Sequence, residues 1–190
     1  MKEKQIVGYI MTGGKNTRMQ GKKKLFLTLE GKSFWNRICE ALSDLMPVYL
    51  SVEQEEPYKN LPFPLVIDAI PDIGPMGGIY TGLKMLDAQA LFVVACDMPF
   101  LSKQTVSQLL EQYQKSKKIT IACEDNRLHP LLGIYPKSAL ANFEAQIASG
   151  NYRLMDILSK TEYVTVKLSN DDLSATNINS IAEYQKLCIK

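Results

Sequence analysis

The 190-residue chain has the length of one domain, and its composition excludes several classes of protein. Hydrophobic residues make up 46% of the chain and charged residues 22%, a balance that supports a packed core and argues against disorder, collagen or a coiled coil. The formal net charge of +2 is too small to predict a surface for nucleic acid or an anionic membrane. We therefore expect a single domain over residues 1–190, with no nucleic-acid or membrane partner.

Membrane and disulfide signals are both weak in the sequence. The longest apolar runs, such as Ala90–Ala95, fall far short of the roughly 20 residues that a membrane span requires. The first apolar stretch, Ile6–Met11, is also too short for a secretory signal and lacks a small-residue cleavage site. The cysteines are scattered without a CxxC pair, which favours reduced thiols in the cytoplasm over a disulfide framework or a zinc site. They are Cys39, Cys96, Cys123 and Cys188.

Short apolar runs bounded by turn residues alternate with stretches of helical periodicity, which is typical of βαβ units. In the first third of the chain we expect a strand at 6–11, a polar loop at 12–24, a β-turn element around Glu30-Gly31, a helix at 35–45, and strands at 48–52 and 65–68. Next come a glycine-punctuated turn at 74–78 with a helix running on to about 86, a strand at 90–95, a helix at 102–114, and strands at 119–123 and 131–135. The last part holds helices at 138–149 and 152–158, a strand at 163–168 and a helix at 180–187. This order predicts an α/β fold, a three-layer α/β/α sandwich with a Rossmann-like, mostly parallel sheet. In such sheets ligands bind beyond the carboxyl ends of the strands, which singles out loops 12–24, 69–78 and 96–101.

The loop at 12–24 carries five lysines and arginines and no acidic residue. Such a loop repels itself unless an anion occupies it, and Gly13 and Gly14 remove Cβ atoms where a ligand could approach backbone N–H groups. The spacing fits neither a P-loop nor a GxGxxG motif. The pattern therefore favours phosphate binding, with a solvated lysine-rich loop as the alternative.

Carboxylates follow two of the expected strands. Asp97 comes directly after the apolar run at 90–96, where it could bridge Mg²⁺ to phosphate oxygens or serve as a turn or helix-capping residue. Asp68 precedes a segment with Gly74, Gly77 and Gly78, which could hold a ribose hydroxyl or base edge or form a tight strand-to-helix connection. These carboxylates are candidate ligands of a nucleotide and its metal.

The single histidine, His129, argues against chemistry that needs a histidine pair or a histidine metal cluster. A hydrolase of the Ser-His-Asp type is not supported either, because no GxSxG-type elbow is present. His129 precedes Pro130 and an apolar strand, a position that suits a structural residue or a contact to a second substrate.

Five ordered blocks resemble the molybdenum cofactor guanylyltransferase family, the enzymes of MobA type. The blocks are MTGGKNTRMQGKKK at 11–24, DAIPDIGPMGG at 68–78, CDMPFL at 96–101, HPLLGIY at 129–135 and NIN at 177–179. They extend over nearly the whole chain, which makes the resemblance specific. Three departures from the family pattern are present: Met11-Thr12 stands for Leu-Ala, Lys23 stands for an acidic residue, and Ser51 stands where the family often has asparagine.

The resemblance implies transfer of GMP from Mg-GTP to the phosphate of molybdopterin or its molybdenum-loaded form, giving the guanine dinucleotide cofactor and pyrophosphate. It implies catalytic roles for Lys24, Arg18 and Asp97, with Asp97 holding the Mg²⁺ cofactor. The implied nucleotide-binding residues are Met11, Thr12, Gly13, Gly14, Lys24, Ser51, Asp68, Gly77 and Asp97. His129, Asn177 and Asn179 are expected on the pterin side.

Two other functions remain open at the level of sequence. One is a sister nucleotidyltransferase such as molybdopterin cytidylyltransferase, because base choice depends on a few loop atoms that the sequence does not place. The other is a non-catalytic nucleotide-binding partner of molybdoenzymes. Molybdoenzyme apoproteins or cofactor-delivery proteins are candidate partners of the enzyme itself.

Overall fold

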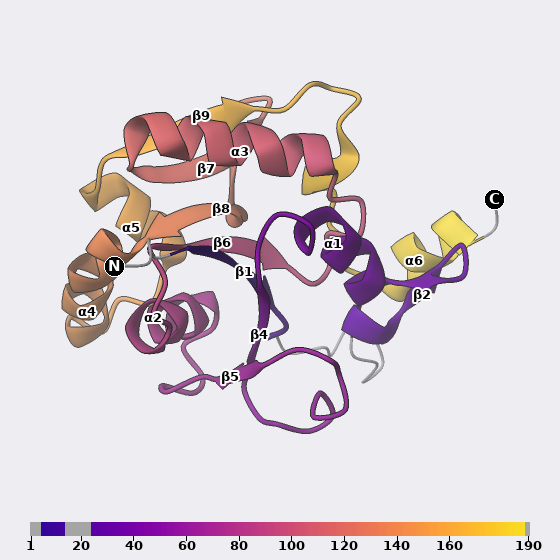
Figure 1. Ribbon diagram of the computed structural model, residues 1–190, viewed down its shortest axis with the longest axis horizontal. Coiled ribbons are helices and arrows are strands. Elements are labelled where there is room, and N and C mark those ends of the chain that lie inside the picture. Colours follow the sequence, from indigo (N-terminus) through magenta and orange to yellow (C-terminus); the bar gives the residue numbers. More distant parts are fainter. Residues whose placement is uncertain (1–4, 14–23, 189–190) are drawn as a thin grey trace.

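The computed structural model describes residues 5–13 and 24–188, which fold around one seven-stranded sheet (Figure 1). In spatial order the strands are β5 (Leu65–Ile67), β4 (Val48–Val52), β1 (Ile6–Met11), β6 (Ala90–Ala95), β8 (Arg127–Pro136), β7 (Ile119–Glu124) and β9 (Tyr163–Lys167). The helices are α1 (Phe34–Leu42), α2 (Pro75–Met85), α3 (Lys103–Ser116), α4 (Leu140–Ala148), α5 (Leu154–Lys160) and α6 (Ile181–Cys188). Short 3₁₀ turns span Lys24–Phe26, Lys137–Ala139 and Leu173–Ala175, and β2 (Thr28–Leu29) pairs with β3 (Lys32–Ser33) in a small hairpin.

The sheet is mostly parallel, as predicted. β4, β1 and β6 pair in parallel, and β5 extends this set at one edge. β8 runs antiparallel to both β6 and β7, so β8 is the strand that interrupts the parallel order. The carboxyl ends of β5, β4, β1 and β6 consequently meet at one edge of the sheet, where the expected site loops begin.

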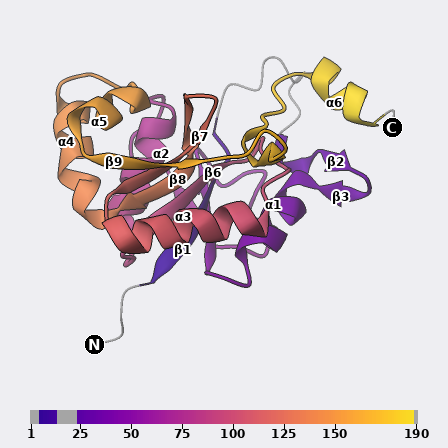
Figure 2. The ribbon, with the colours of Figure 1, turned by 90° about the horizontal axis from the view of Figure 1, so that it is seen from above.

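Helices cover both faces of the sheet and make the three-layer sandwich. In β1, Ile10 belongs to the core shared with α1 and α3, whereas Tyr9 and Met11 belong to the core shared with α2, α4 and α5. This alternation follows from the two-residue period of a strand. In Figure 1, β1 and β4 pass between α1 and α2, and Figure 2 shows the strands between α3 and the helices α4 and α5. The fully buried β6 is therefore the central strand that its continuous apolar run predicts.

Element boundaries differ from the prediction by a few residues, most clearly in the first helix and in β8. The first helix begins at Phe34, capped by the Ser33 hydroxyl, and ends at Leu42 rather than at 45. The strand expected at 131–135 is the second half of β8, which begins at Arg127 after a tight turn. Asp125 and Asn126 form that turn with positive φ angles of 45° and 65°, so the strands expected at 119–123 and 131–135 pair as an antiparallel hairpin.

The C-terminal segment packs against the N-terminal part of the chain, around residues 28–34. Helix α6 lies beside the β2–β3 hairpin in both ribbon views (Figures 1 and 2), and the Tyr184 hydroxyl donates a hydrogen bond to the Thr28 carbonyl. The same ring packs edge-on against Phe34, with ring centroids 6.2 Å apart. This packing brings residues 177–179, just before α6, to the carboxyl edge of the sheet. In the described part of the chain, no helix is long and apolar enough to span a membrane.

Gly133 in β8 packs closely against the backbone of β7. A Cβ atom there would lie 2.5 Å from the Thr120 carbonyl oxygen, beside the irregular register between Ile121 and Ala122. We expect Gly133→Ala to lower the free energy of unfolding by about 1–3 kcal/mol, because the clashing backbone of a central strand cannot move freely.

The matched control is Gly8→Ala in β1, where a Cβ meets only side-chain carbons of Leu42 and Val48 at 3.3 Å. Urea unfolding of both variants checks the prediction. An equal or smaller loss for Gly133→Ala than for Gly8→Ala would contradict it.

Candidate functional site

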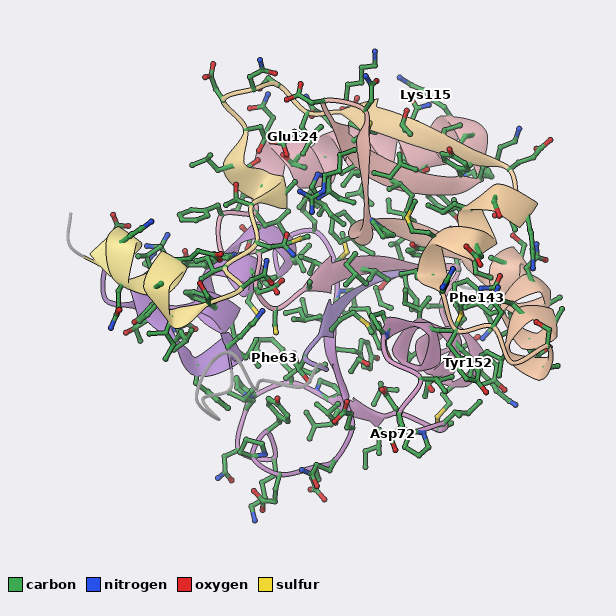
Figure 3. The ribbon with its side chains drawn as sticks, turned by 180° about the vertical axis from the view of Figure 1, so that it is seen from behind. Phe63, Asp72, Lys115, Glu124, Phe143 and Tyr152 are labelled. Carbon is green, nitrogen blue, oxygen red and sulfur yellow. The ribbon has the colours of Figure 1, made fainter. Side chains whose placement is uncertain are left out.

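A cleft opens at the carboxyl edge of the sheet, where the prediction placed the site. Its walls come from the ends of β1, β4, β5 and β6, the start of α2, β8 and the segment before α6. The lining residues are Met11, Gly13, Lys24, Glu53, Asp68, Gly74, Pro75, Ala95, Cys96, Asp97, Leu131 and Asn177. Figure 3 shows Asp72, in the connection between β5 and α2, near the β5 edge, and Glu124 toward the opposite edge of the sheet.

An ion pair marks one end of the cleft. Lys24 Nζ lies 2.7 Å from Asp97 Oδ2, and both side chains are nearly buried, with 15% and 14% of their surface exposed. Lys24 Nζ also donates to Asn179 Oδ1 at 3.2 Å, and Asn177 Nδ2 donates to Asp97 Oδ1 at 3.3 Å. The cation and the carboxylate are thus held together by residues from three distant parts of the sequence.

Backbone contacts fix Asp97 at the end of the central strand. The Cys96 N–H donates to the Met11 carbonyl, which continues the β1–β6 ladder to the edge of the cleft. The Asp97 carbonyl in turn accepts from the Ile178 N–H at 2.9 Å. The segment at 177–179 is therefore bonded to Asp97 through both its backbone and its side chains.

The other end of the cleft is acidic. Asp68 follows β5 and accepts a hydrogen bond from the Ser51 hydroxyl at 2.9 Å, and Glu53 follows β4. Burial raises the pKa of Asp68 to about 6; the Ser51 hydrogen bond opposes this shift, and the negative charge of Glu53 adds to it. The cleft thus carries the Lys24–Asp97 ion pair at one end and two further carboxylates at the other.

Some predicted contact residues lie behind the cleft rather than in it. The Thr12 hydroxyl donates to the Ser51 carbonyl at 2.6 Å, which fastens β1 to β4. Ser51 is buried and positions Asp68. A Cβ at Gly77 would lie 2.8 Å from the Ile70 carbonyl oxygen, so this glycine lets the loop before α2 pack closely. These three residues shape the wall of the site.

The donor groups of the cleft fit a divalent cation only with help from a ligand. In residues 5–13 and 24–188, no three His, Cys, Asp or Glu side chains gather in a way that could hold a metal ion. Mg²⁺ is commonly held by one or two carboxylates together with substrate phosphates, and Asp97 can supply such a carboxylate. The residues therefore fit a cation shared between Asp97 and a bound polyphosphate.

Comparison with known proteins identifies the family. Residues 8–166 match the family described as the MobA-like NTP transferase domain. The chain belongs to this family.

Curated relatives of the MobA-like chain carry one name. A protein of Flavobacterium johnsoniae, named "Probable molybdenum cofactor guanylyltransferase", is 30% identical over 97% of both chains. A protein of Aquifex aeolicus with the same name is 31% identical over 90% of this chain and 83% of its own.

Solved structures confirm the fold of the MobA-like domain. Molybdopterin-guanine dinucleotide biosynthesis protein A from Archaeoglobus fulgidus superposes with a TM-score of 0.81 at 22% identity, covering 96% of this chain and 97% of its own. The 2-C-methyl-D-erythritol 4-phosphate cytidylyltransferase from Thermus thermophilus has a TM-score of 0.67 at 15% identity, covering 95% of each chain. Because a cytidylyltransferase shares this architecture, the fold alone does not determine which nucleotide base is bound.

Two residues predicted for the MobA-like site lie outside the described part of the chain, and His129 does not line the cleft. Gly14 and Arg18 lie outside the described residues. His129 is buried on β8 and is not among the lining residues. Its Nε2 atom lies 3.5 Å from Glu124 Oε2, too long for a good hydrogen bond, and burial lowers its pKa. The structure thus surrounds His129 with protein and places Leu131, two residues on, in the cleft wall.

Glu53 is the charged residue of the described cleft lining that the sequence analysis did not predict. It occupies the first position after β4, as Asp68 does after β5, and Asp97 follows two residues after the end of β6. That shared position was the available signal, since the carboxyl ends of parallel strands meet at one edge. Glu53 also belongs to the acidic segment EQEE at 53–56, and such segments usually form solvated surfaces.

The raised pKa of Asp68 predicts a pH-dependent stability. The native state binds this proton more tightly than the unfolded chain, in which aspartate has a pKa of about 3.9. The contribution of Asp68 to stability therefore falls as the pH rises from about 4 to about 6. We expect Asp68→Asn to become progressively more stable relative to wild type from pH 4 to pH 7, as measured by urea unfolding.

The control is Asp44→Asn: Lys103 lowers the pKa of the Asp44 carboxyl, so its contribution to stability is lost only below about pH 4, and the difference from wild type should stay nearly constant from pH 4 to pH 7. A constant difference between Asp68→Asn and wild type across this range would show that the carboxyl has an ordinary pKa.

Proposed function

We propose that this protein transfers GMP from Mg-GTP to the phosphate of molybdopterin, releasing pyrophosphate. The observation that carries the proposal is the Lys24–Asp97 pair at the edge of a nucleotidyltransferase sheet, in a chain whose curated relatives are named molybdenum cofactor guanylyltransferases. We also propose that it acts in the cytoplasm, where molybdoenzyme apoproteins or cofactor-delivery proteins would receive the product.

The reaction needs charge neutralisation more than proton transfer. An oxygen of the acceptor phosphate attacks the α-phosphorus of GTP, the new P–O bond forms, and the bond from the α-phosphorus to the α–β bridging oxygen breaks. The electron pair leaves with pyrophosphate. Because the nucleophile is already an anion, the chain needs no strong general base, in keeping with its single histidine.

Lys24 is the group we assign to the phosphates. Its ammonium has three donors, of which Asp97 and Asn179 accept two in the structure. A triphosphate would draw Lys24 toward its oxygens, and the ammonium would stabilise the charge that develops on the departing pyrophosphate. Arg18, in the same basic segment of the sequence, is proposed to assist.

Asp97 is the residue we assign to Mg²⁺. When bound there, the ion supplies neutralisation of the phosphate charge. Asn177 orients the Asp97 carboxylate through its 3.3 Å hydrogen bond. On the acceptor side we propose Asn177 and Asn179, which stand at the cation end, with His129 farther along β8.

We expect Lys24→Ala to reduce turnover roughly 10²–10³-fold, because one preorganised donor to the transition state is lost. The assay measures pyrophosphate release from GTP and molybdopterin. The control Lys103→Ala removes an exposed lysine that pairs with Asp44, and its turnover should stay at the wild-type rate. Wild-type turnover by folded Lys24→Ala would overturn the assignment of this lysine.

Asp97→Asn tests the metal assignment separately. We expect the variant to lose the gain in GTP affinity that Mg²⁺ gives the wild-type protein, because an amide replaces the anionic ligand. Calorimetric titration of GTP with and without Mg²⁺ measures this gain, and Asp44→Asn serves as the surface control. If Asp97→Asn kept the full Mg²⁺ effect, the ion would have to be held elsewhere.

A further inference from the structure

The unequal charge of the cleft sets the direction in which a nucleotide can lie. The triphosphate carries several negative charges and is attracted to Lys24, whose partner Asp97 we assign to Mg²⁺, while the carboxylates of Glu53 and Asp68 repel it from the other end. The nucleoside must then lie toward the ends of β4 and β5. This step rests on the proposed function, since it takes the ligand to be a nucleoside triphosphate.

Glu53 has the freer carboxylate of the two at the nucleoside end. Asp68 is half-buried and already accepts a hydrogen bond from Ser51. Glu53 is exposed, and within residues 5–13 and 24–188 no hydrogen bond or ion pair engages its carboxylate. Its Oε1 atom lies 3.8 Å from the position that a Cβ on Gly13 would take, so it faces the end of β1.

The chemistry of an ionised carboxylate selects among the bases. Such a group accepts hydrogen bonds and donates none. The Watson–Crick edge of guanine presents two adjacent donors, N1–H and the 2-amino group, which together match the two oxygens of a carboxylate. Cytosine presents one amino donor beside the N3 and O2 acceptors, and those acceptors would face a negative charge without a proton between them. A free carboxylate at this position therefore favours guanine over cytosine.

We infer that Glu53 is a specificity-determining residue that accepts hydrogen bonds from N1–H and the 2-amino group of guanine. Asp68, which accepts a hydrogen bond from Ser51, would contact the ribose. The assignment gives a physical basis for base choice, which the fold shared with a cytidylyltransferase leaves open. It also gives a role to a charged lining residue that lies outside the motif blocks.

The test pairs a change in the protein with a change in the ligand. GTP and ITP differ only in the 2-amino group, so binding of both to wild type and to Glu53→Gln isolates the contact to that group. We expect Glu53→Gln to weaken GTP binding by about 10–100-fold and ITP binding by clearly less, because the substitution affects two charge-assisted hydrogen bonds with GTP and only the N1–H bond with ITP. The ratio of GTP to CTP affinity should fall in the same variant.

Two controls distinguish a contact between Glu53 and the base from a general charge effect and from a contact to the ribose. Glu55→Gln alters another exposed acid in the same segment and should bind GTP as the wild type does. Titration with 2′-deoxy and 3′-deoxy GTP tests contact with the ribose. If Glu53→Gln weakened GTP and ITP equally but spared a deoxy analogue, Glu53 would bind the sugar and the inference would be wrong.

Failure of the inference differs from failure of the proposed function. Wild-type protein that binds Mg-GTP, with Glu53→Gln binding GTP equally well, would overturn the role of Glu53 alone. Wild-type protein that binds no GTP would overturn both. Circular dichroism of Glu53→Gln confirms that any loss arises in a folded protein.

Discussion

The ion pair between Lys24 and Asp97 is the contact on which the site depends. Asp97 stands at the end of the most buried strand, and Lys24 begins the short 3₁₀ turn that leads into the β2–β3 hairpin. Asn177 and Asn179 bond to the two members of the pair, so the C-terminal segment closes the same end of the cleft. A nearly buried pair of opposite charges is stable only while both partners are present, and an incoming polyanion with its cation offers each of them a new partner.

The parallel strands bring together charges that lie far apart in the sequence. Four strands end at one edge, and the residues just beyond them include Glu53, Asp68 and Asp97. Glu53 and Asp68 lie at the other end of the cleft from Lys24 and its partner Asp97, which gives a nucleotide one favourable orientation. The burial of Asp68 and its bond to Ser51 keep one of the two acids in place at the nucleoside end. Orientation and base choice thus follow from the same charge arrangement.

The sequence predicted the fold and the cation end of the site because both depend on local patterns. Apolar runs, caps such as Ser102 and the carboxylate after ALFVVA are visible in short windows. The sequence could not distinguish a residue that lines the cleft from one that supports it. Thr12 and Gly77 lie in the motif blocks and Ser51 lies in β4, yet their contacts are with neighbouring backbone and side chains, and those contacts exist only after the strands pair. Glu53 does line the cleft, but the acidic segment around it is typical of a solvated surface, so the sequence did not identify it.

A competition assay tests the central claim most directly. The wild-type protein is incubated with molybdopterin, Mg²⁺ and equal concentrations of GTP, CTP, ATP and UTP, and the pterin product is identified by its mass. The account predicts the guanine dinucleotide of molybdopterin, with pyrophosphate released in equal amount. A cytosine dinucleotide as the main product, or no dinucleotide from folded protein, would contradict it.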